Sequence, residues 1–217
     1  FRPADGTWHF LLKGLNYSAR QFGSAGDIPV PGDFNGDGKT DIAVFRPSNG
    51  VWYIANSDSR GTFTFVQFGL AGDKTVPADY DGDGKTDIAV YRPAGGVWYV
   101  LKSSDGSFTA TSFGIETDLL AQGDFDADGK ADLAVYRPAD GLWYLLRTTE
   151  GFGAFQFGIS GDVPSTGDYD GDGRADLAVF RPSNGVWYLQ RSQQGFFAAQ
   201  FGIATDRSVP AAYLPAP

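Results

Sequence analysis

The 217-residue sequence contains no cysteine, no methionine and a single histidine, His9. Without cysteine the chain has no disulfides, no thiolate metal ligands and no cysteine nucleophile. His9 stands alone in a strand-like run, where an ordinary side chain is a more natural role than a ligand or a base. We therefore predict that the protein is not an enzyme and that it has no catalytic residues.

Long hydrophobic runs and helical patterns are missing as well. No stretch of about 18 apolar residues occurs, so no transmembrane helix is expected, and no signal peptide is present in this numbering. Because the chain begins at Phe1, we expect a processed or excised segment. With 42% hydrophobic and 15% aromatic residues, it can bury the core of a stable single domain.

One acidic loop, with the pattern D-x-[DN]-x-D-G-[KR]-x-D, occurs four times. Carboxylates this close together repel one another unless a cation compensates them, and Ca²⁺ takes six to eight oxygen ligands. The glycine at position 6 allows a sharp turn around such an ion. We therefore predict four Ca²⁺ sites with ligands from positions 1, 3, 5, 7 (through the carbonyl) and 9: Asp33, Asn35, Asp37, Lys39 and Asp41; Asp79, Asp81, Asp83, Lys85 and Asp87; Asp124, Asp126, Asp128, Lys130 and Asp132; and Asp168, Asp170, Asp172, Arg174 and Asp176.

The loop resembles the first part of an EF-hand, but position 12 excludes that motif. An EF-hand needs a bidentate glutamate there. The residues at this position are Val44, Val90, Val135 and Val179, inside short β-branched runs that are typical of strands. The prediction is a calcium loop closed by the aspartate at position 9 and set between two strands. Since all its ligands come from one tight loop, we expect a structural ion rather than a catalytic one.

The net charge of −9 is accounted for by the same loops. They hold three acidic residues in the first copy and four in each of the others, together 15 of the chain's 26. Four bound Ca²⁺ ions would leave a charge of about −1 on the protein, so the acidity does not require a cationic partner. No basic stripe remains that could neutralise phosphates, which excludes nucleic acid as the expected partner.

The loops belong to a longer repeat. Five tryptophans, Trp8, Trp52, Trp98, Trp143 and Trp187, recur at intervals of 44, 46, 45 and 44 residues, and such periods are typical of solenoids and propellers. In the second unit, strand-like segments cover residues 76–80, 87–93, 97–102 and 108–114, with the acidic loop between the first two. We therefore predict that each unit forms one four-stranded antiparallel blade of an all-β propeller.

A Gln-Phe-Gly triplet lies at residues 21–23, 67–69, 156–158 and 200–202, with Ser112-Phe-Gly114 in the third unit. With these triplets and the acidic loops at one period, the chain resembles the FG-GAP and VCBS-type repeats, also seen in the integrin α-subunit propeller, over essentially its whole length. The resemblance implies a propeller with calcium in the loops that join the first and second strands of its blades. Its units are shorter than integrin units, so integrin ligand specificity is not carried over.

The two ends of the sequence align with complementary parts of one unit. Residues 1–3 match the middle of a unit, and residues 209–213 match the start of one. We therefore predict a single domain over residues 1–217, a closed propeller of five repeats of about 45 residues. Its fifth blade would combine residues 1–23 and 209–217. Ala212 and Leu214 stand where its first two aspartate ligands would be, so this blade would lack a calcium loop. A fragment of a longer array is the alternative.

Three recurring side chains allow more than one interpretation. The tryptophans either pack between blades, which their constant position favours, or offer a flat face to a sugar. The recurring arginine and aspartate either form buried ion pairs that lock neighbouring blades, or form a face of donors for an acidic or hydroxylated ligand such as a glycan. These residues are Arg2, Arg46, Arg92, Arg137 and Arg181, and Asp27, Asp73, Asp118, Asp162 and Asp206.

The function that fits these features is a non-catalytic, calcium-stabilised binding or adhesion module that recognises carbohydrate or a surface protein. Since calcium is near millimolar outside the cell, we expect a secreted or surface-displayed module, bacterial by resemblance. One alternative is a structural scaffold or a subunit of an extracellular fibre, with self-association or attachment to a larger secreted protein. Another is the accessory domain of a secreted hydrolase or lyase. Fold alone does not choose among them.

Overall fold

The computed structural model describes residues 1–12, 14, 16–57 and 61–206. All regular elements in this part of the chain are β-strands, and most of them form four-stranded antiparallel sheets. The predicted all-β propeller is confirmed. No helix of the length and apolarity needed to cross a membrane occurs among the described residues.

The sheets follow the order of the sequence. A two-stranded hairpin consists of β1 (Thr7–Leu12) and β2 (Asn16–Gln21). Blade 1 contains β3 (Ile28–Pro29), β4 (Ile42–Arg46), β5 (Val51–Ala55) and β6 (Phe63–Gln67). Blade 2 contains β7 (Lys74–Thr75), β8 (Ile88–Arg92), β9 (Val97–Leu101) and β10 (Phe108–Ser112). Blade 3 contains β11 (Leu119–Leu120), β12 (Leu133–Arg137), β13 (Leu142–Arg147) and β14 (Gly151–Gln156). Blade 4 contains β15 (Val163–Pro164), β16 (Leu177–Arg181), β17 (Val186–Arg191) and β18 (Gly195–Gln200).

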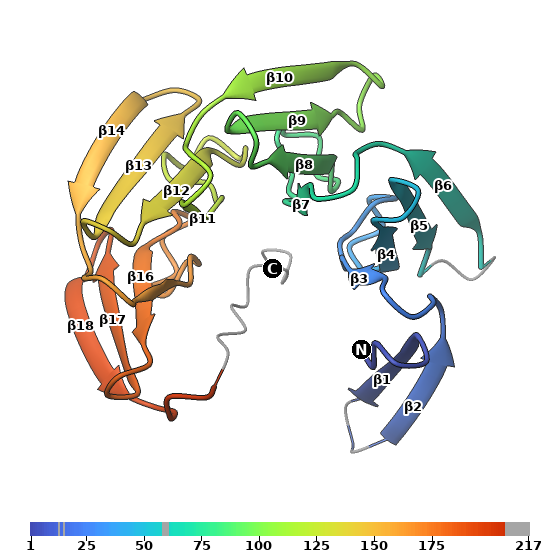
Figure 1. Ribbon diagram of the computed structural model, residues 1–217, viewed down its shortest axis with the longest axis horizontal. Helices are drawn as coiled ribbons and strands as arrows, with labels where there is room; N and C mark the ends of the chain where they lie inside the picture. Colours follow the sequence, from blue (N-terminus) through green and yellow to red (C-terminus); the bar gives the residue numbers. More distant parts are fainter. Residues whose placement is uncertain (13, 15, 58–60, 207–217) are drawn as a thin grey trace.

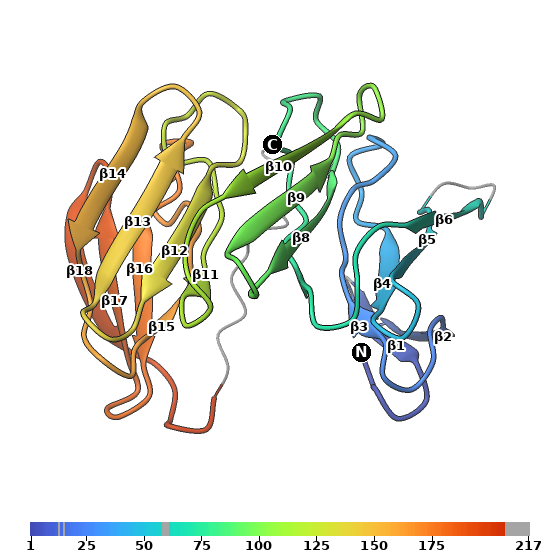
Figure 2. The ribbon, with the colours of Figure 1, turned by 45° about the horizontal axis from the view of Figure 1, so that its top comes forward.

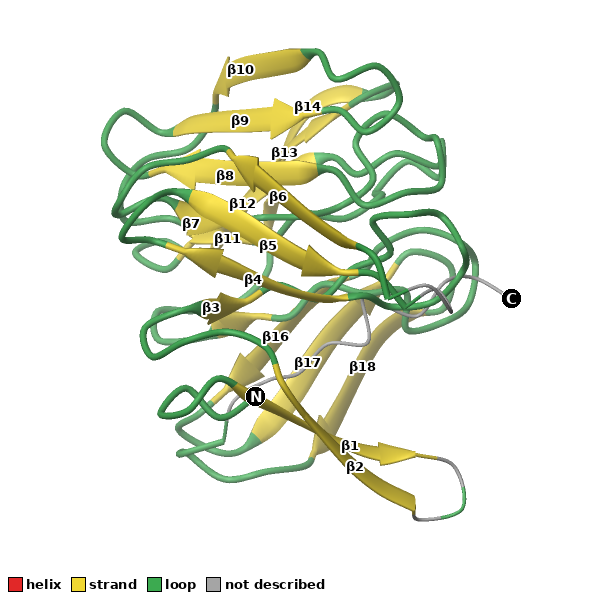
Figure 3. Ribbon diagram, turned by 90° about the vertical axis from the view of Figure 1, so that its right-hand side faces the viewer, coloured by secondary structure: helices red, strands yellow, loops and turns green. Residues whose placement is uncertain are grey.

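These sheets lie side by side along an arc, with the first strand of each blade innermost and the fourth at the periphery (Figure 1). The strands run between two rims of loops, as the tilted and side views show (Figures 2 and 3). The hairpin and blade 4 lie at the two ends of the arc. The described residues thus form four four-stranded blades and a two-stranded hairpin, not five complete blades. Residues 209–217 lie outside the described residues, so the composite fifth blade stays a prediction.

The first strand of blade 2 begins earlier than predicted. It covers Lys74–Thr75, paired with Tyr91 and Val90, rather than residues 76–80. After this strand, the Val76 N–H donates to the Ala89 carbonyl, and a bridge joins Ala78 to Asp87. Beyond this bridge the chain enters the acidic loop, where the Tyr80 N–H donates to the Asp87 carboxylate instead of to a neighbouring strand. That change of partner ends the pairing of this segment with the second strand.

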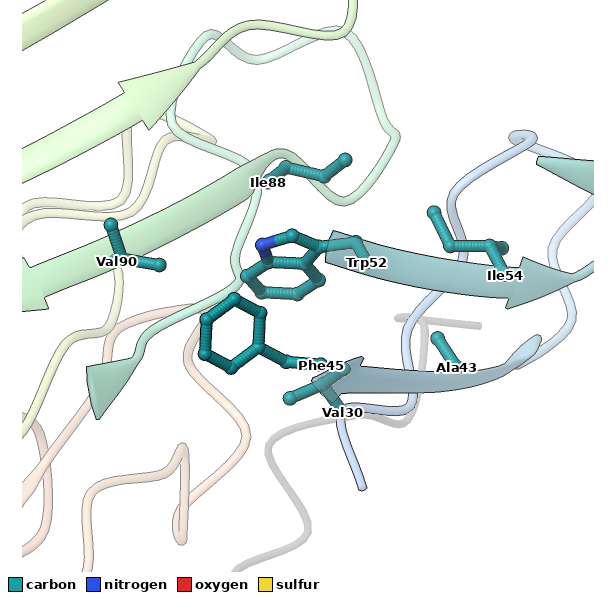
Figure 4. Close-up of a cluster of buried hydrophobic side chains, with 7 residues drawn as sticks. All are labelled: Val30, Ala43, Phe45, Trp52, Ile54, Ile88 and Val90. Atoms are coloured by element: carbon teal, nitrogen blue, oxygen red, sulfur yellow. The ribbon is translucent and has the colours of Figure 1, made fainter. Parts of the chain in front are cut away.

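The core lies between blades and is built around the tryptophans. Trp52 is fully buried and packs with Phe45 of its own blade against Ile88 and Val90 of β8 in the next blade (Figure 4). The next blade contributes Tyr99 to the same cluster. Trp98 and Trp143 repeat the arrangement at the following two junctions, so the packing interpretation is confirmed for these three residues.

The recurring arginine and aspartate form ion pairs within each of the four blades. In blade 3 the Arg137 guanidinium donates to both oxygens of Asp118, at 2.8 and 2.9 Å, and lies 4.4 Å from the centre of the Tyr144 ring. Equivalent pairs join Arg46 to Asp27, Arg92 to Asp73 and Arg181 to Asp162. Each pair fastens the second strand of a blade to the crossover that leads into that blade, which agrees with the ion-pair interpretation.

We expect Arg137→Met to lower the free energy of unfolding by about 3 kcal/mol, because it leaves the buried Asp118 carboxylate without its counter-charge. Urea denaturation would measure the loss. Arg2→Met is the matched control, since Arg2 pairs with Asp5 at the surface and should contribute less than about 1 kcal/mol. If Arg137→Met instead left stability unchanged and abolished binding of a ligand, the arginines would be ligand donors rather than structural partners.

Candidate metal centres in the acidic loops

Each acidic loop is folded around the carboxylate at position 1. In the first loop Asp33 accepts hydrogen bonds from the N–H groups of Gly36 (2.7 Å), Asp37 (3.2 Å) and Gly38 (2.8 Å). The same carboxylate–backbone bonds recur in the other three loops, from Gly82 and Gly84, from Asp128 and Gly129, and from Gly171, Asp172 and Gly173. The loop backbone therefore curls back over its own first aspartate.

The aspartate at position 9 is the buried anchor of each loop. In the third loop Asp132 has no exposed surface, and it accepts hydrogen bonds from the N–H groups of Phe125 at position 2 and of Thr148 in the hairpin between β13 and β14. Burial raises the pKa of Asp132 to about 6. Burial also raises the pKa of Asp87 and of Asp176 in the second and fourth loops.

The hairpin between the third and fourth strands of each blade contributes contacts that the sequence analysis did not identify. One of its residues lies 16 positions after the position-9 aspartate in all four units: Ser57, Ser103, Thr148 and Ser192. Each of these residues donates its N–H to the position-9 carboxylate and its hydroxyl to the carboxylate at position 5. The constant spacing of a hydroxyl residue was the sequence feature that could have revealed them.

In three loops the carboxylates at positions 1, 3 and 9 converge closely enough to hold one metal ion. The groups are Asp79, Asp81 and Asp87; Asp124, Asp126 and Asp132; and Asp168, Asp170 and Asp176, each with ligand oxygens within 4.8 Å of one another. The first loop has the same backbone hydrogen bonds but carries an amide, Asn35, at position 3. The position-7 residues donate their N–H groups to the position-5 carboxylates, and their predicted role as carbonyl ligands stays a prediction.

A hard cation fits these clusters. The Oδ1 atoms of Asp126 and Asp170 are buried and have no hydrogen-bond partner in the protein. A buried carboxylate oxygen without a partner is costly, and a bound Ca²⁺, which takes oxygen ligands including carboxylates, would remove that cost. The residues present therefore fit the ion that the loops predict.

Neighbouring loops are joined to one another. The carbonyl of Asp33 accepts a hydrogen bond from the Thr86 N–H of the next loop at 2.7 Å, and the carbonyl of Asp79 accepts one from the Ala131 N–H at 2.6 Å. The third and fourth loops repeat the bond between Asp124 and Ala175. The backbone carbonyl at position 1 thus binds the following loop, while the carboxylate at position 1 accepts hydrogen bonds from its own loop. The first three loops surround a hollow of about 320 Å³ on this rim.

We expect the metal-free protein to lose stability as the pH rises from about 4 to about 6, because of the titration of Asp132. Its pKa of about 6 exceeds the ordinary value of 3.8, so the folded state binds the proton more tightly. This contribution is complete below pH 3.8 and is lost as the pH rises through about 6. In calcium-depleted buffer, the melting temperature of Asp132→Asn relative to that of the wild type should increase as the pH rises over this range. Asp140→Asn, in an exposed turn, is the control, and parallel curves for all three proteins would contradict the assignment.

Comparison with known proteins agrees with this geometry. A family model described as FG-GAP-like repeat matches residues 33–90, 79–135 and 124–179, and each match begins at the first aspartate of one of the first three loops. No curated protein sequence matches the chain.

Solved propeller structures share the fold at low sequence identity. A streptogramin B lyase is 10% identical with a TM-score of 0.56, covering 90% of this chain and 58% of its own. Virginiamycin B lyase from Staphylococcus aureus is 6% identical with a TM-score of 0.59, covering 90% of this chain and 63% of its own. BBS1N in complex with ARL6DN is 13% identical with a TM-score of 0.54, covering 90% of this chain and 58% of its own. The chain spans less than two thirds of these structures, and at such identities the likeness concerns the fold alone.

Proposed function

Because the chain belongs to the FG-GAP-like repeat family, we propose that it is a calcium-stabilised propeller that binds a ligand without transforming it. Four Ca²⁺ ions would be held by the twenty loop residues predicted from the sequence, one ion in each loop. The converging aspartates and the unpartnered buried oxygens of Asp126 and Asp170 support this assignment. Calcium near millimolar would keep such loops filled, which supports a secreted or surface-displayed location.

Exposed aromatic side chains on the outer strands support carbohydrate as the ligand. Phe65 on β6 is 70% exposed, and Phe152 on β14 and Phe196 on β18 are exposed to a similar degree. Each lies against the tyrosine of the adjacent third strand, with ring centres 6.4 to 6.5 Å apart. The exposed faces of these phenylalanine rings are flat and apolar, which suits the C–H face of a sugar ring.

A glycan array probed in millimolar calcium, and again in chelator, tests the proposal. We expect calcium-dependent binding to one class of sugar. Binding should fall at least about tenfold in Phe152→Ser and Phe196→Ser, because each variant removes a stacking surface worth about 1.4 kcal/mol or more. Thr109→Ala, on the exposed face of β10, is the matched control. A blank array from folded, calcium-loaded protein would reject carbohydrate and direct attention to a surface protein.

A structural or assembly role is the second candidate, and the two ends of the arc favour it. Phe201 after β18 is 79% exposed, and Leu11 and Tyr17 on the hairpin are about as open. Trp187 is only half-buried, unlike its equivalents in blades 1 to 3. Light scattering after size-exclusion chromatography over a range of concentrations would detect association, and a monomer at all concentrations would argue against this role.

A further inference from the structure

The four acidic loops differ in how their position-3 residue is held. In the third loop Asp126 Oδ2 accepts three hydrogen bonds from the hairpin between β13 and β14, from the Thr149 N–H (2.8 Å), the Thr149 hydroxyl (2.6 Å) and the Glu150 N–H (3.1 Å). Asp126 is 7% exposed, and its other oxygen, Oδ1, has no partner. The hairpin thus fixes one oxygen and leaves the other free on a buried, immobilised carboxylate.

The other loops have weaker versions of this arrangement. In the fourth loop Asp170 accepts two hairpin N–H groups, from Gln193 and Gln194, and no hydroxyl of the described residues reaches it. In the second loop Asp81 accepts the Ser104 hydroxyl at 2.6 Å and its N–H at a long 3.4 Å. Asp81 and Asp170 are both only half-buried. The first loop carries Asn35, which brings no negative charge to the site.

We propose that these hairpins set the calcium affinity of the loops in their own blades, so that the third loop binds calcium most tightly and the first most weakly. This inference rests on the proposed calcium binding. Calcium loops are tuned by ligand charge and by rigidity, and outer hydrogen-bond partners that orient a ligand commonly change metal affinity by about 10- to 100-fold. The third loop has the full set of four carboxylates and the best-held position 3, while the first lacks one carboxylate.

Thr148 and Thr149 act as positioning residues in this proposal. The Thr148 hydroxyl holds Asp128 at position 5, at 2.6 Å, and Thr149 holds Asp126 at position 3. Neither hydroxyl is a predicted ligand, so their removal leaves the ligand set intact. What the variant loses is the orientation of two carboxylates before the ion arrives.

Calorimetric titration of the metal-free protein with CaCl₂ tests the inference. We expect several resolved affinities in the wild type and about a tenfold weaker tightest step in Thr148→Ala/Thr149→Ala. The conservative Thr148→Ser/Thr149→Ser should restore that step, and Thr109→Ala on the exposed face of β10 should leave it unchanged. Asp124→Asn should remove the tightest step, whereas Asp33→Asn should remove the weakest.

The melting temperature without calcium separates positioning from a merely structural role. We expect the double alanine variant to melt below the wild type by a larger margin in calcium than in chelator, because the lost hydrogen bonds cost some stability in both conditions and calcium affinity in addition. Equal loss of stability in both conditions, or wild-type calcium affinity in the double variant, would overturn the inference. A wild type that binds no calcium at all would instead overturn the proposed function.

Discussion

Removal of calcium should lower the melting temperature of the protein by at least about 20 °C. A site that is filled to about 100 times its dissociation constant contributes about 2.7 kcal/mol, and four such sites contribute about 11 kcal/mol. For a domain of this size, each kcal/mol corresponds to about 2 to 4 °C. The structure supplies the reason for the loss, because the chelated protein would retain clusters of carboxylates within 4.8 Å of one another and two buried oxygens without partners.

Differential scanning calorimetry in 1 mM CaCl₂, in EGTA and in EGTA with excess MgCl₂ would measure this effect. Magnesium should restore little of the stability, since it prefers a strict octahedral shell and retains its waters. Identical melting curves in calcium and in chelator would contradict the structural role of the ion. They would also mean that the repulsion within the loops is relieved in some other way.

Substitution of a junction tryptophan should have the second largest effect. Trp143→Ala removes a side chain that has no exposed surface and a hydrogen bond of 2.8 Å from its indole N–H to the Phe157 carbonyl. The resulting cavity should cost about 4 kcal/mol of unfolding free energy. Trp143→Phe, which keeps part of the ring, should cost less. Urea unfolding followed by circular dichroism gives both values.

Trp187→Ala extends this experiment to the end of the arc. The Trp187 side chain makes the same hydrogen bond, to the Phe201 carbonyl, but it is only half-buried. We expect less than half the loss found for Trp143→Ala. An equal loss would mean that a further blade covers this face in solution, as the predicted composite fifth blade would do.

Much of the fold could be predicted because one unit recurs with constant spacing. The valines at position 12 marked the strand after each loop, and the structure places Val90 in β8 and Val135 in β12. The pairing of recurring arginines with recurring aspartates was also one of two interpretations open from the sequence, since two rings of opposite charge lie on one rim. The bounds of the first strand in blade 2 were not predictable, because pairing after Thr75 is reduced to single contacts and the Asp87 carboxylate accepts the Tyr80 N–H.

The constant spacing of the hydroxyl residues is visible in the sequence, but it does not say which atoms of the loops these residues contact. Ser103 and Ser104 look like ordinary turn residues, which are common in hairpins. Their role depends on the third strand returning the chain to the rim where the loop lies, 16 and 23 residues away from their partners. The pairing register of the second and third strands determines where the hairpin lies relative to the loop.

The junction between consecutive blades has a consequence for how such proteins change over time. At each junction the tryptophan of one blade packs in a cluster that includes a tyrosine of the next blade. A backbone hydrogen bond also joins the carbonyl at position 1 of one loop to the N–H at position 8 of the following loop. The same kinds of contact therefore join each blade to the blade that follows it. Loss of residues 79–123 by one in-frame deletion would bring the first and third loops together with the same backbone hydrogen-bonding groups. Gene duplication or deletion can thus alter the number of blades without the invention of a new interface.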